Sequence, residues 1–307
     1  MSRPIASVEV PSSSANLGSG FDCFAAALSL KLRAELHEGD DAGILLNAHG
    51  EGVPRDDENP DENLLIRAFR EGMRLALAGG GGAWRLEVSS MIPAARGLGS
   101  SAAAIVAGLL LGASLGRRSP DADELLAAAA RLEGHADNVA AALYGGITLA
   151  VLSAHERVTL RRFHAPEAWI PVVFLPQRES QTAEMRRALP LAVPHHDASA
   201  AAGRAALLAT AVITGDAALL REAMDDRLHQ PYRLPQLPGS AELIETAYAH
   251  GAAGAALSGA GPSVLAICDS PAAAHSVEKA FNAFDLPGMA TRLRFDTTGA
   301  RLTGSSS

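Results

Sequence analysis

The sequence predicts an α+β protein with two domains, and three observations support this expectation. Strand and helix patterns alternate irregularly along the chain, which favours α+β over a doubly wound parallel sheet. The chain has 307 residues, enough for two domains with their own cores, and its composition changes near residues 155–166. It is 48% apolar but only 4% aromatic. We therefore expect tightly packed cores built mainly from small side chains.

The first half alternates short strands with helices rich in alanine and leucine. Strands are predicted over residues 5–10, 44–46, 84–89 and 145–149, and a polar, glycine-bearing loop over residues 11–22. Helices are predicted over residues 63–77, 102–115 and 123–132. The first helix has apolar residues at helical spacing and stops at a glycine run, and the third begins with acidic residues, which the helix dipole favours.

The second half is predicted to be richer in helix. Strands are expected over residues 170–175, 264–268 and 291–296. Helices are expected over residues 180–188, 198–214, 217–228, 241–250 and 271–284. A second glycine-rich turn covers residues 258–263, just before the second of these strands. Prolines and glycines separate these segments, which is how turns are usually marked.

Charge and cysteine content limit the classes of partner. The formal net charge is −8, which argues against nucleic acid or an acidic membrane surface as a partner. No run of about 18 apolar residues predicts a membrane span, and residues 1–10 lack a secretory signal pattern. Cys23 and Cys268 are the two cysteines, far apart and without metal-binding spacing. We expect a reduced, cytoplasmic protein.

The segment Pro93-Ala-Ala-Arg-Gly-Leu-Gly-Ser-Ser-Ala-Ala-Ala104 lies between a predicted strand and a predicted helix. Gly97 and Gly99 can adopt backbone angles closed to other residues, and Ser100 and Ser101 are good N-cap residues. Backbone N–H groups at such a helix start attract anions such as phosphate. The segment is not a P-loop, because no Gly-Lys-Ser/Thr follows, nor a dinucleotide-binding fingerprint, which needs a third glycine.

Four motifs in order resemble those of the GHMP small-molecule kinases and, within them, the homoserine kinases. They are Pro11-x-x-Ser14-Ala-Asn-Leu-Gly-x-Gly-Phe-Asp22, the phosphate loop Pro93-x-x-x-Gly-Leu-Gly-Ser-Ser-Ala102, Glu133-Gly-His-x-Asp-Asn-Val-Ala140, and Leu257-Ser-Gly-x-Gly-Pro-Ser263. The resemblance spans almost the whole chain. Ser19 and Ala136 stand where many members have proline, and neither change removes a donor or a charge.

The resemblance implies a fold and an activity. It implies an N-terminal α+β domain that carries the phosphate loop, here residues 1–160, and a C-terminal ferredoxin-like domain, here residues 161–307. It implies ATP-dependent phosphorylation of the L-homoserine hydroxyl to O-phospho-L-homoserine, in threonine biosynthesis. Family members are often dimers, so it also suggests a homodimer.

The resemblance also assigns residues to ATP and Mg²⁺. Backbone amides from Gly97 to Ser101 would surround the phosphates, and the Ser101 hydroxyl and Glu133 would hold Mg²⁺, with Glu124 as the alternative carboxylate. Oxygen ligands of this kind suit a hard cation. The full set assigned to the nucleotide is Asn63, Pro93, Arg96, Gly97, Leu98, Gly99, Ser100, Ser101 and Ala102.

Homoserine is a zwitterion, so its site needs groups of both signs. Matching family positions assign Asn16, Asp22 and Asn138 to the amino group and hydroxyl. They assign Arg186 and Arg233 to the carboxylate, for which a planar guanidinium is well suited. Thr182 and Gly259 complete the substrate set.

Three questions remain open from the sequence. Asp137 is a general base in some relatives, but here we favour transfer by positioning and charge alone. A related kinase acting on mevalonate or a sugar is the nearest alternative, against which Asp22 argues by favouring a cationic amine. A non-catalytic ligand-binding protein with this fold is the second, and it would be expected to lack Ser101, the metal carboxylate or the loop glycines.

Overall fold

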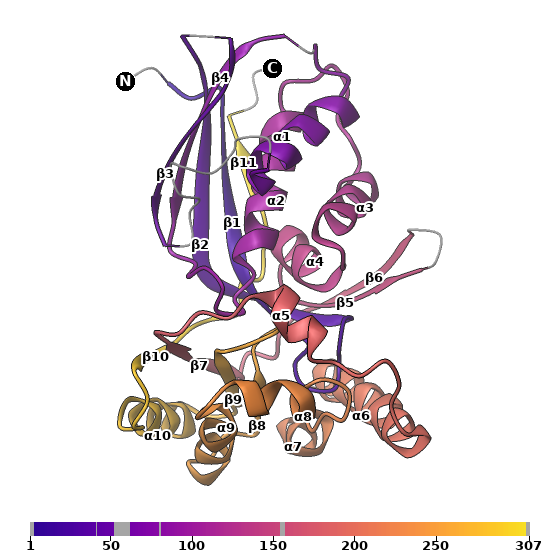
Figure 1. Cartoon of the computed structure of the whole chain (residues 1–307), viewed down its shortest axis with the longest axis vertical. Helices are drawn as coiled ribbons and strands as arrows, with labels where there is room; N and C mark the ends of the chain where they lie inside the picture. The colour runs from indigo at the N-terminus through magenta and orange to yellow at the C-terminus, as the bar shows by residue number, and fades with distance from the viewer. Residues whose placement is uncertain (1–2, 41, 52–61, 80, 154–156, 305–307) are drawn as a thin grey trace.

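The computed structural model describes residues 3–40, 42–51, 62–79, 81–153 and 157–304. Two β-sheets, one at each end of the molecule, are joined at a waist where the short helix α5 (Thr182–Arg187) lies (Figure 1). Helices α1 to α4 cover one face of the large sheet, and the remaining helices lie around the small one. Two largely antiparallel sheets, each packed against helices, confirm the predicted α+β class.

The large sheet has the strand order β11-β1-β2-β4-β3, with β5 paired to β2 and to β6. All neighbours are antiparallel except β3 and β4. The long strand β2 organises it, because its first residues pair with β5 and its later ones with β4, while β1 runs along both parts. The bounds are β1 Ala6–Ala15, β2 Phe24–Glu38, β3 Gly43–Gly50, β4 Ala83–Ser90, β5 Ile147–Leu152, β6 Val158–Phe163 and β11 Arg301–Thr303.

Close packing of small residues brings the covering helices together. A Cβ atom on Gly112 of α2 would lie 1.9 Å from the carbonyl oxygen of Phe69 on α1, so this crossing requires glycine. Most of α2 is buried, as its apolar composition predicted. Asn63 caps α1 by accepting hydrogen bonds from two backbone N–H groups of its first turn. The bounds are α1 Leu64–Leu75, α2 Ser100–Ala113, α3 Ala122–Glu133 and α4 Asp137–Tyr144.

The small sheet has the antiparallel order β10-β7-β9-β8 and follows the β-α-β-β-α-β sequence of a ferredoxin-like domain, as expected. Several helices connect its first two strands, and α10 connects the last two. None of the described helices is both long and apolar enough to cross a membrane. The bounds are β7 Ile170–Pro176, α6 His195–Thr214, α7 Leu220–Ala223, α8 Gln230–Arg233, α9 Ser240–Ala249, β8 Gly254–Leu257, β9 Val264–Cys268, α10 Pro271–Asn282 and β10 Gly288–Arg292.

Three predicted elements differ from the structure. Residues 11–15 are not loop but continue β1, after a register shift between Pro11 and Ser12, because their small side chains fit between β2 and the helices. The helix predicted over 217–228 is a 3₁₀ turn, Ala217–Leu219, followed by the single turn α7. The last strand is Gly288–Arg292 rather than 291–296, and chain beyond it returns to the large sheet as β11.

The predicted division at residue 160 remains a prediction. Strand β6 of the large sheet extends to Phe163, and β11 pairs with β1 at the other end of the chain. Lys31 on β2 forms an ion pair of 2.5 Å with Asp296, just ahead of β11. The C-terminal segment therefore crosses back from the small sheet to the large one.

Candidate active site

A cleft with a volume of about 620 Å³ lies between the large sheet with its helices and the small-sheet half. It is lined by the three glycine-bearing segments that the sequence analysis singled out, and by the polar residues that join α3 to α4. Of the predicted site residues, the following line this cleft: Asn16, Asp22, Asn63, Pro93, Gly97, Leu98, Gly99, Ser100, Ser101, Glu133, Asp137, Asn138, Thr182, Arg186, Arg233 and Gly259.

Hydrogen bonds join the three glycine-bearing segments directly. The Ser258 side chain lies 2.6 Å from the carbonyl oxygen of Gly97 and 2.8 Å from the Ser14 hydroxyl. The backbone N–H of Gly259 donates to Ala15, and the side-chain amide of Asn16 donates to Gly259. Segments separated by more than 240 residues are therefore held together as one wall of the cleft.

The phosphate-loop segment enters α2 through two left-handed glycines, Gly97 at φ 74° and Gly99 at φ 68°. A Cβ atom on Gly97 would lie 2.1 Å from the carbonyl oxygen of Ser258, so the loop requires glycine for space as well as for conformation. Gly99 is the N-cap, which corrects the expected cap at Ser100 or Ser101; both serines belong to the first helical turn. That turn faces the cleft, where a helix start attracts anions.

Ser101 and Glu133 meet in the cleft. The Ser101 hydroxyl donates to Oε1 of Glu133 at 2.7 Å, although one begins α2 and the other ends α3. Burial raises the pKa of Glu133, and the hydrogen bond from Ser101 opposes this only in part. A half-buried carboxylate beside a hydroxyl and an anion-attracting helix start is a donor set that fits Mg²⁺.

Glu124 lies at the opposite end of α3 from Glu133. Its side chain bonds to Arg118 and to the N-cap residue Asp121, whose own side chain bonds back to the backbone of Glu124. This reciprocal arrangement is a capping box, and stabilising the start of the helix is a sufficient role for Glu124 without a metal ion. Glu124 is not among the residues that line the cleft.

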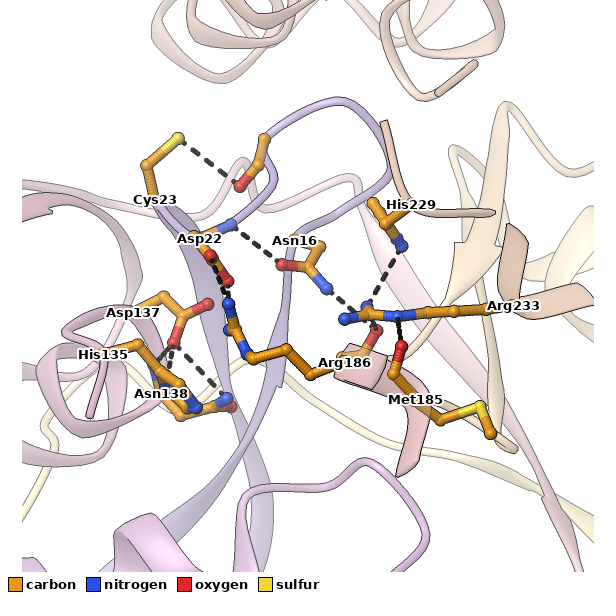
Figure 2. Close-up of polar contacts among 12 residues, drawn as sticks. Asn16, Asp22, Cys23, His135, Asp137, Asn138, Met185, Arg186, His229 and Arg233 are labelled. Carbon is orange, nitrogen blue, oxygen red and sulfur yellow. Dashed lines mark hydrogen bonds and ion pairs between the residues drawn. The ribbon is translucent and has the colours of Figure 1, made fainter. Parts of the chain in front are cut away.

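Groups of both signs also gather in the cleft, and Figure 2 shows Asp22, Arg186 and Arg233 near one another. Arg186 donates two hydrogen bonds to the Asp22 carboxylate, from Nη1 to Oδ2 at 3.0 Å and from Nη2 to Oδ1 at 2.8 Å. Arg233 is only 2% exposed, and burial lowers its pKa to about 10, with the charge of Arg186 acting in the same direction. It still carries its charge at neutral pH. Asn16 lies beside it, and both donate to the Gly259 carbonyl.

Asp137 lies close enough to both Glu133 and Arg186 to interact with their charges, and it is itself hydrogen-bonded. Its Oδ1 accepts from the backbone N–H of Asn138 at 2.6 Å and lies 3.1 Å from Nδ1 of His135. Burial opposes protonation of His135, but the contact with Asp137 outweighs it and raises the pKa of the imidazole. The Asn138 side chain accepts from the hydroxyl of Ser13, which fixes its orientation.

Two predicted residues do not line the cleft. The Arg96 guanidinium donates to the backbone carbonyls of Ala94, Pro176 and Gln177, so it ties the loop to the small-sheet half. Ala102 is buried within α2. Sequence reasoning also missed an apolar flank that gives no motif signal, because its members are ordinary strand and helix residues: Leu32, Leu46, Leu64, Leu65 and Val88. Ser180 and Gln181, just before α5, and Ala183, within it, were missed for the same reason.

Comparisons with known proteins agree with this geometry. Residues 63–146 match the family described as GHMP kinases N terminal domain, and residues 206–285 match GHMP kinases C terminal. The chain is 38% identical over 300 residues to the homoserine kinase of Synechococcus sp. (strain CC9311), covering 95% of this chain and 94% of that protein. It is 40% identical over 301 residues to that of Streptomyces coelicolor, covering 95% and 93%.

Solved structures show the same similarity. The crystal structure of homoserine kinase from Cytophaga hutchinsonii superimposes with a TM-score of 0.87 at 25% identity, covering 99% of each chain. The mevalonate kinase of L. major superimposes with a TM-score of 0.71 at 18% identity, covering 97% of this chain and 100% of that one. The second likeness concerns the fold alone.

Proposed function

The chain belongs to the homoserine kinases of the GHMP kinase family, and from this premise we propose that it phosphorylates the hydroxyl of L-homoserine with ATP. The products are ADP and O-phospho-L-homoserine, an intermediate of threonine biosynthesis. The observation that carries the choice of substrate is the pairing of Asp22 with Arg186 beside the buried Arg233. A small zwitterion needs both signs within a few ångströms.

The phosphates of ATP are proposed to bind at the first turn of α2. Backbone N–H groups and the helix dipole supply positive potential there, since the loop has no lysine. Ser101 and Glu133 would hold Mg²⁺, which when bound neutralises charge that develops on the outer phosphates. Apolar residues of the cleft wall, among them Leu46 and Val88, would contact the adenine near Asn63.

Homoserine is proposed to bind beside the phosphates, at the charged residues of the same cleft. Its carboxylate would meet Arg186 and Arg233, and its ammonium group would meet Asp22, so that binding exchanges the Asp22–Arg186 ion pair for three ion pairs with the ligand. Asn16 and Asn138 then orient the hydroxyl toward the phosphate loop. Holding both reactants in line is itself a large part of the catalysis of phosphoryl transfer.

We propose that Asp137 orients rather than abstracts a proton, because Oδ1 already accepts from Asn138 and contacts His135. Asp137→Asn is then expected to lower kcat by about tenfold, whereas loss of a general base would lower it by roughly 10²–10⁴-fold. Measured kcat at saturating substrates decides between the two. A thousandfold loss with unchanged KM values would make Asp137 the base.

The acceptor is tested by ADP release in a coupled assay with Mg²⁺-ATP and L-homoserine, mevalonate or galactose. Turnover on homoserine with little or none on the others is expected. Turnover confined to mevalonate or galactose would refute the choice of substrate but not the kinase. A homodimer and a cytoplasmic location remain predictions.

A further inference from the structure

A buried imidazole lies behind Arg233 and has no part in the function proposed above. His229 immediately precedes α8 and is completely buried. It does not line the cleft, whereas Arg233, one helical turn later, does. Asp226, also buried, accepts hydrogen bonds from the backbone N–H groups of Leu228, His229 and Gln230 and so fixes the start of the turn.

The partners of His229 define which nitrogen carries its proton. Nε2 lies 3.0 Å from the carbonyl oxygen of Gly18, which can only accept, so Nε2 is protonated. Nδ1 lies 3.2 Å from Nη1 of Arg233, which can only donate, so Nδ1 is the acceptor (Figure 2). Burial lowers the pKa of His229, and the adjacent guanidinium acts in the same direction against the opposing charge of Asp226. The ring is therefore neutral.

These contacts determine the orientation of the Arg233 guanidinium. Nη1 points to His229 and to the Gly259 carbonyl, and Nε points to the carbonyl of Met185. The ring of Phe21 stacks on His229 at 5.1 Å and lies 5.3 Å from the guanidinium carbon of Arg233. Within the described part of the chain, no hydrogen bond uses Nη2. The guanidinium is therefore anchored through Nη1 and Nε, on a residue that lines the cleft.

We propose that His229 is a positioning residue for substrate recognition. By accepting from Nη1 through Nδ1 and donating to Gly18 through Nε2, it holds Arg233 at the angle at which Nη2 meets the carboxylate of an α-amino acid. It also links this arginine to the loop that carries Asn16 and Asp22, so the groups for both charges of the substrate move together. The proposal rests on the homoserine kinase activity proposed above.

Two amide substitutions separate the roles of the two ring nitrogens. His229→Asn keeps an acceptor at the place of Nδ1 and loses the donor to Gly18, whereas His229→Gln keeps a donor near Nε2 and loses the acceptor for Arg233. We expect His229→Gln to raise KM for homoserine by about tenfold or more, as for a lost hydrogen bond to a charged group. His229→Asn should raise it less than about threefold, with KM for ATP unchanged in both. His250→Gln, on the exposed surface, is the matched control.

A substrate analogue without a carboxylate distinguishes positioning from a general structural defect. 3-Aminopropan-1-ol is homoserine with hydrogen in place of the carboxylate. His229→Gln should weaken binding of homoserine while leaving the inhibition constant of 3-aminopropan-1-ol against homoserine unchanged. Equal losses for both compounds, or equal KM values for the asparagine and glutamine variants, would overturn the proposal. Absence of turnover on homoserine by the unmodified enzyme would instead refute the proposed function.

The protonation pattern provides a test that needs no substitution. In ¹⁵N-histidine spectra of the unmodified protein at neutral pH, the Nδ1 signal of His229, assigned through His229→Asn or by sequential correlation, should show an unprotonated nitrogen. A protonated Nδ1 would overturn the proposal even if the glutamine variant failed to fold.

Discussion

Replacing Glu133 with glutamine removes one negative charge from the cleft and keeps a side chain of nearly the same size. In the structure Oε1 of Glu133 accepts from the Ser101 hydroxyl at 2.7 Å. Among the described residues no lysine or arginine forms an ion pair with this carboxylate, and burial raises its pKa. A half-buried carboxylate without a cationic partner is destabilising, and a bound cation would offset that cost. The substitution therefore isolates the charge that Mg²⁺ would require.

The expected effect on rate follows from the loss of one electrostatic stabiliser at the transferring phosphate. Such losses lower kcat by about 10²–10³-fold, or about 2.7–4 kcal/mol in the activation free energy. We expect the lower value for Glu133→Gln, because the amide oxygen can still accept from Ser101 and can still coordinate a cation weakly. Ser101→Ala should lower kcat by a similar factor of about 10² for the same reason.

ADP release over a range of Mg²⁺ concentrations measures this effect. Glu124→Gln is the matched control, since that side chain belongs to the capping box at the far end of α3, and its kcat should change by less than about twofold. Unchanged kcat in Glu133→Gln together with an inactive Glu124→Gln would refute the reasoning and move the metal site.

The same substitution should act in the opposite direction on stability. A carboxyl group whose pKa is raised by folding destabilises the folded state progressively as pH rises from the unfolded pKa, near 4.5, through the folded one. Without Mg²⁺, Glu133→Gln is therefore expected to unfold at a higher temperature than the unmodified protein at pH 7 to 8. A lower unfolding temperature in the presence of a chelator would contradict this.

Three further predictions concern the loop, the substrate pocket and the C-terminal crossing. Gly97→Ala should lower the free energy of unfolding by about 3 kcal/mol, because the new Cβ would lie 2.1 Å from a backbone oxygen. Gly215→Ala is the control: its new Cβ would have no atom closer than 3.7 Å, so it should lower the free energy of unfolding by only about 1 kcal/mol. Equal losses for the two variants in urea titrations would contradict the close approach at Gly97. Asp22→Asn should raise KM for homoserine by about tenfold or more. Because this carboxylate is partly exposed, the free energy of unfolding should change by less than about 1 kcal/mol. An unchanged KM would exclude Asp22 from the substrate site. Burial alone would raise the pKa of Asp296, but hydrogen bonds from Lys31 and from two backbone N–H groups outweigh it and hold this pKa below its usual value of 3.8. The stability that this carboxylate adds is therefore present above pH 4 and lost as pH falls through the folded pKa. Asp296→Asn should lower the free energy of unfolding by about 2 kcal/mol at pH 7, and the difference from the unmodified protein should shrink on acidification. A difference that stayed constant with pH would exclude the ionic contribution.

The glycine-bearing segments could be predicted from the sequence because local backbone geometry dictates their residue types. Gly97 and Gly99 have positive φ, and Gly97 also packs directly against another backbone. Their order along the chain was sufficient to indicate the fold and the wall of the cleft. The N-cap was misassigned because serine and glycine both suit that position, and the choice depends on a contact of Gly99 with the distant Ser13.

The features that could not be predicted depend on partners far away in sequence. The serines of residues 12–14 are polar and small, which is typical of a loop, yet they are buried as strand residues against residues 26–28 of β2. Strand β11 has only three residues and pairs with Ser7–Glu9 at the other end of the chain. His229 carried no signal at all, since its contact with Gly18 spans 211 residues.

The most direct test of the central claim is to identify the phosphorylated product. Mixing the purified protein with Mg²⁺-ATP and L-homoserine should give one new phosphomonoester signal in the ³¹P spectrum, equal in amount to the ADP formed and coupled to the side-chain methylene protons next to oxygen. Inorganic phosphate as the only new species besides ADP, or no consumption of ATP by folded protein, would contradict a cleft that binds a triphosphate next to a small zwitterion.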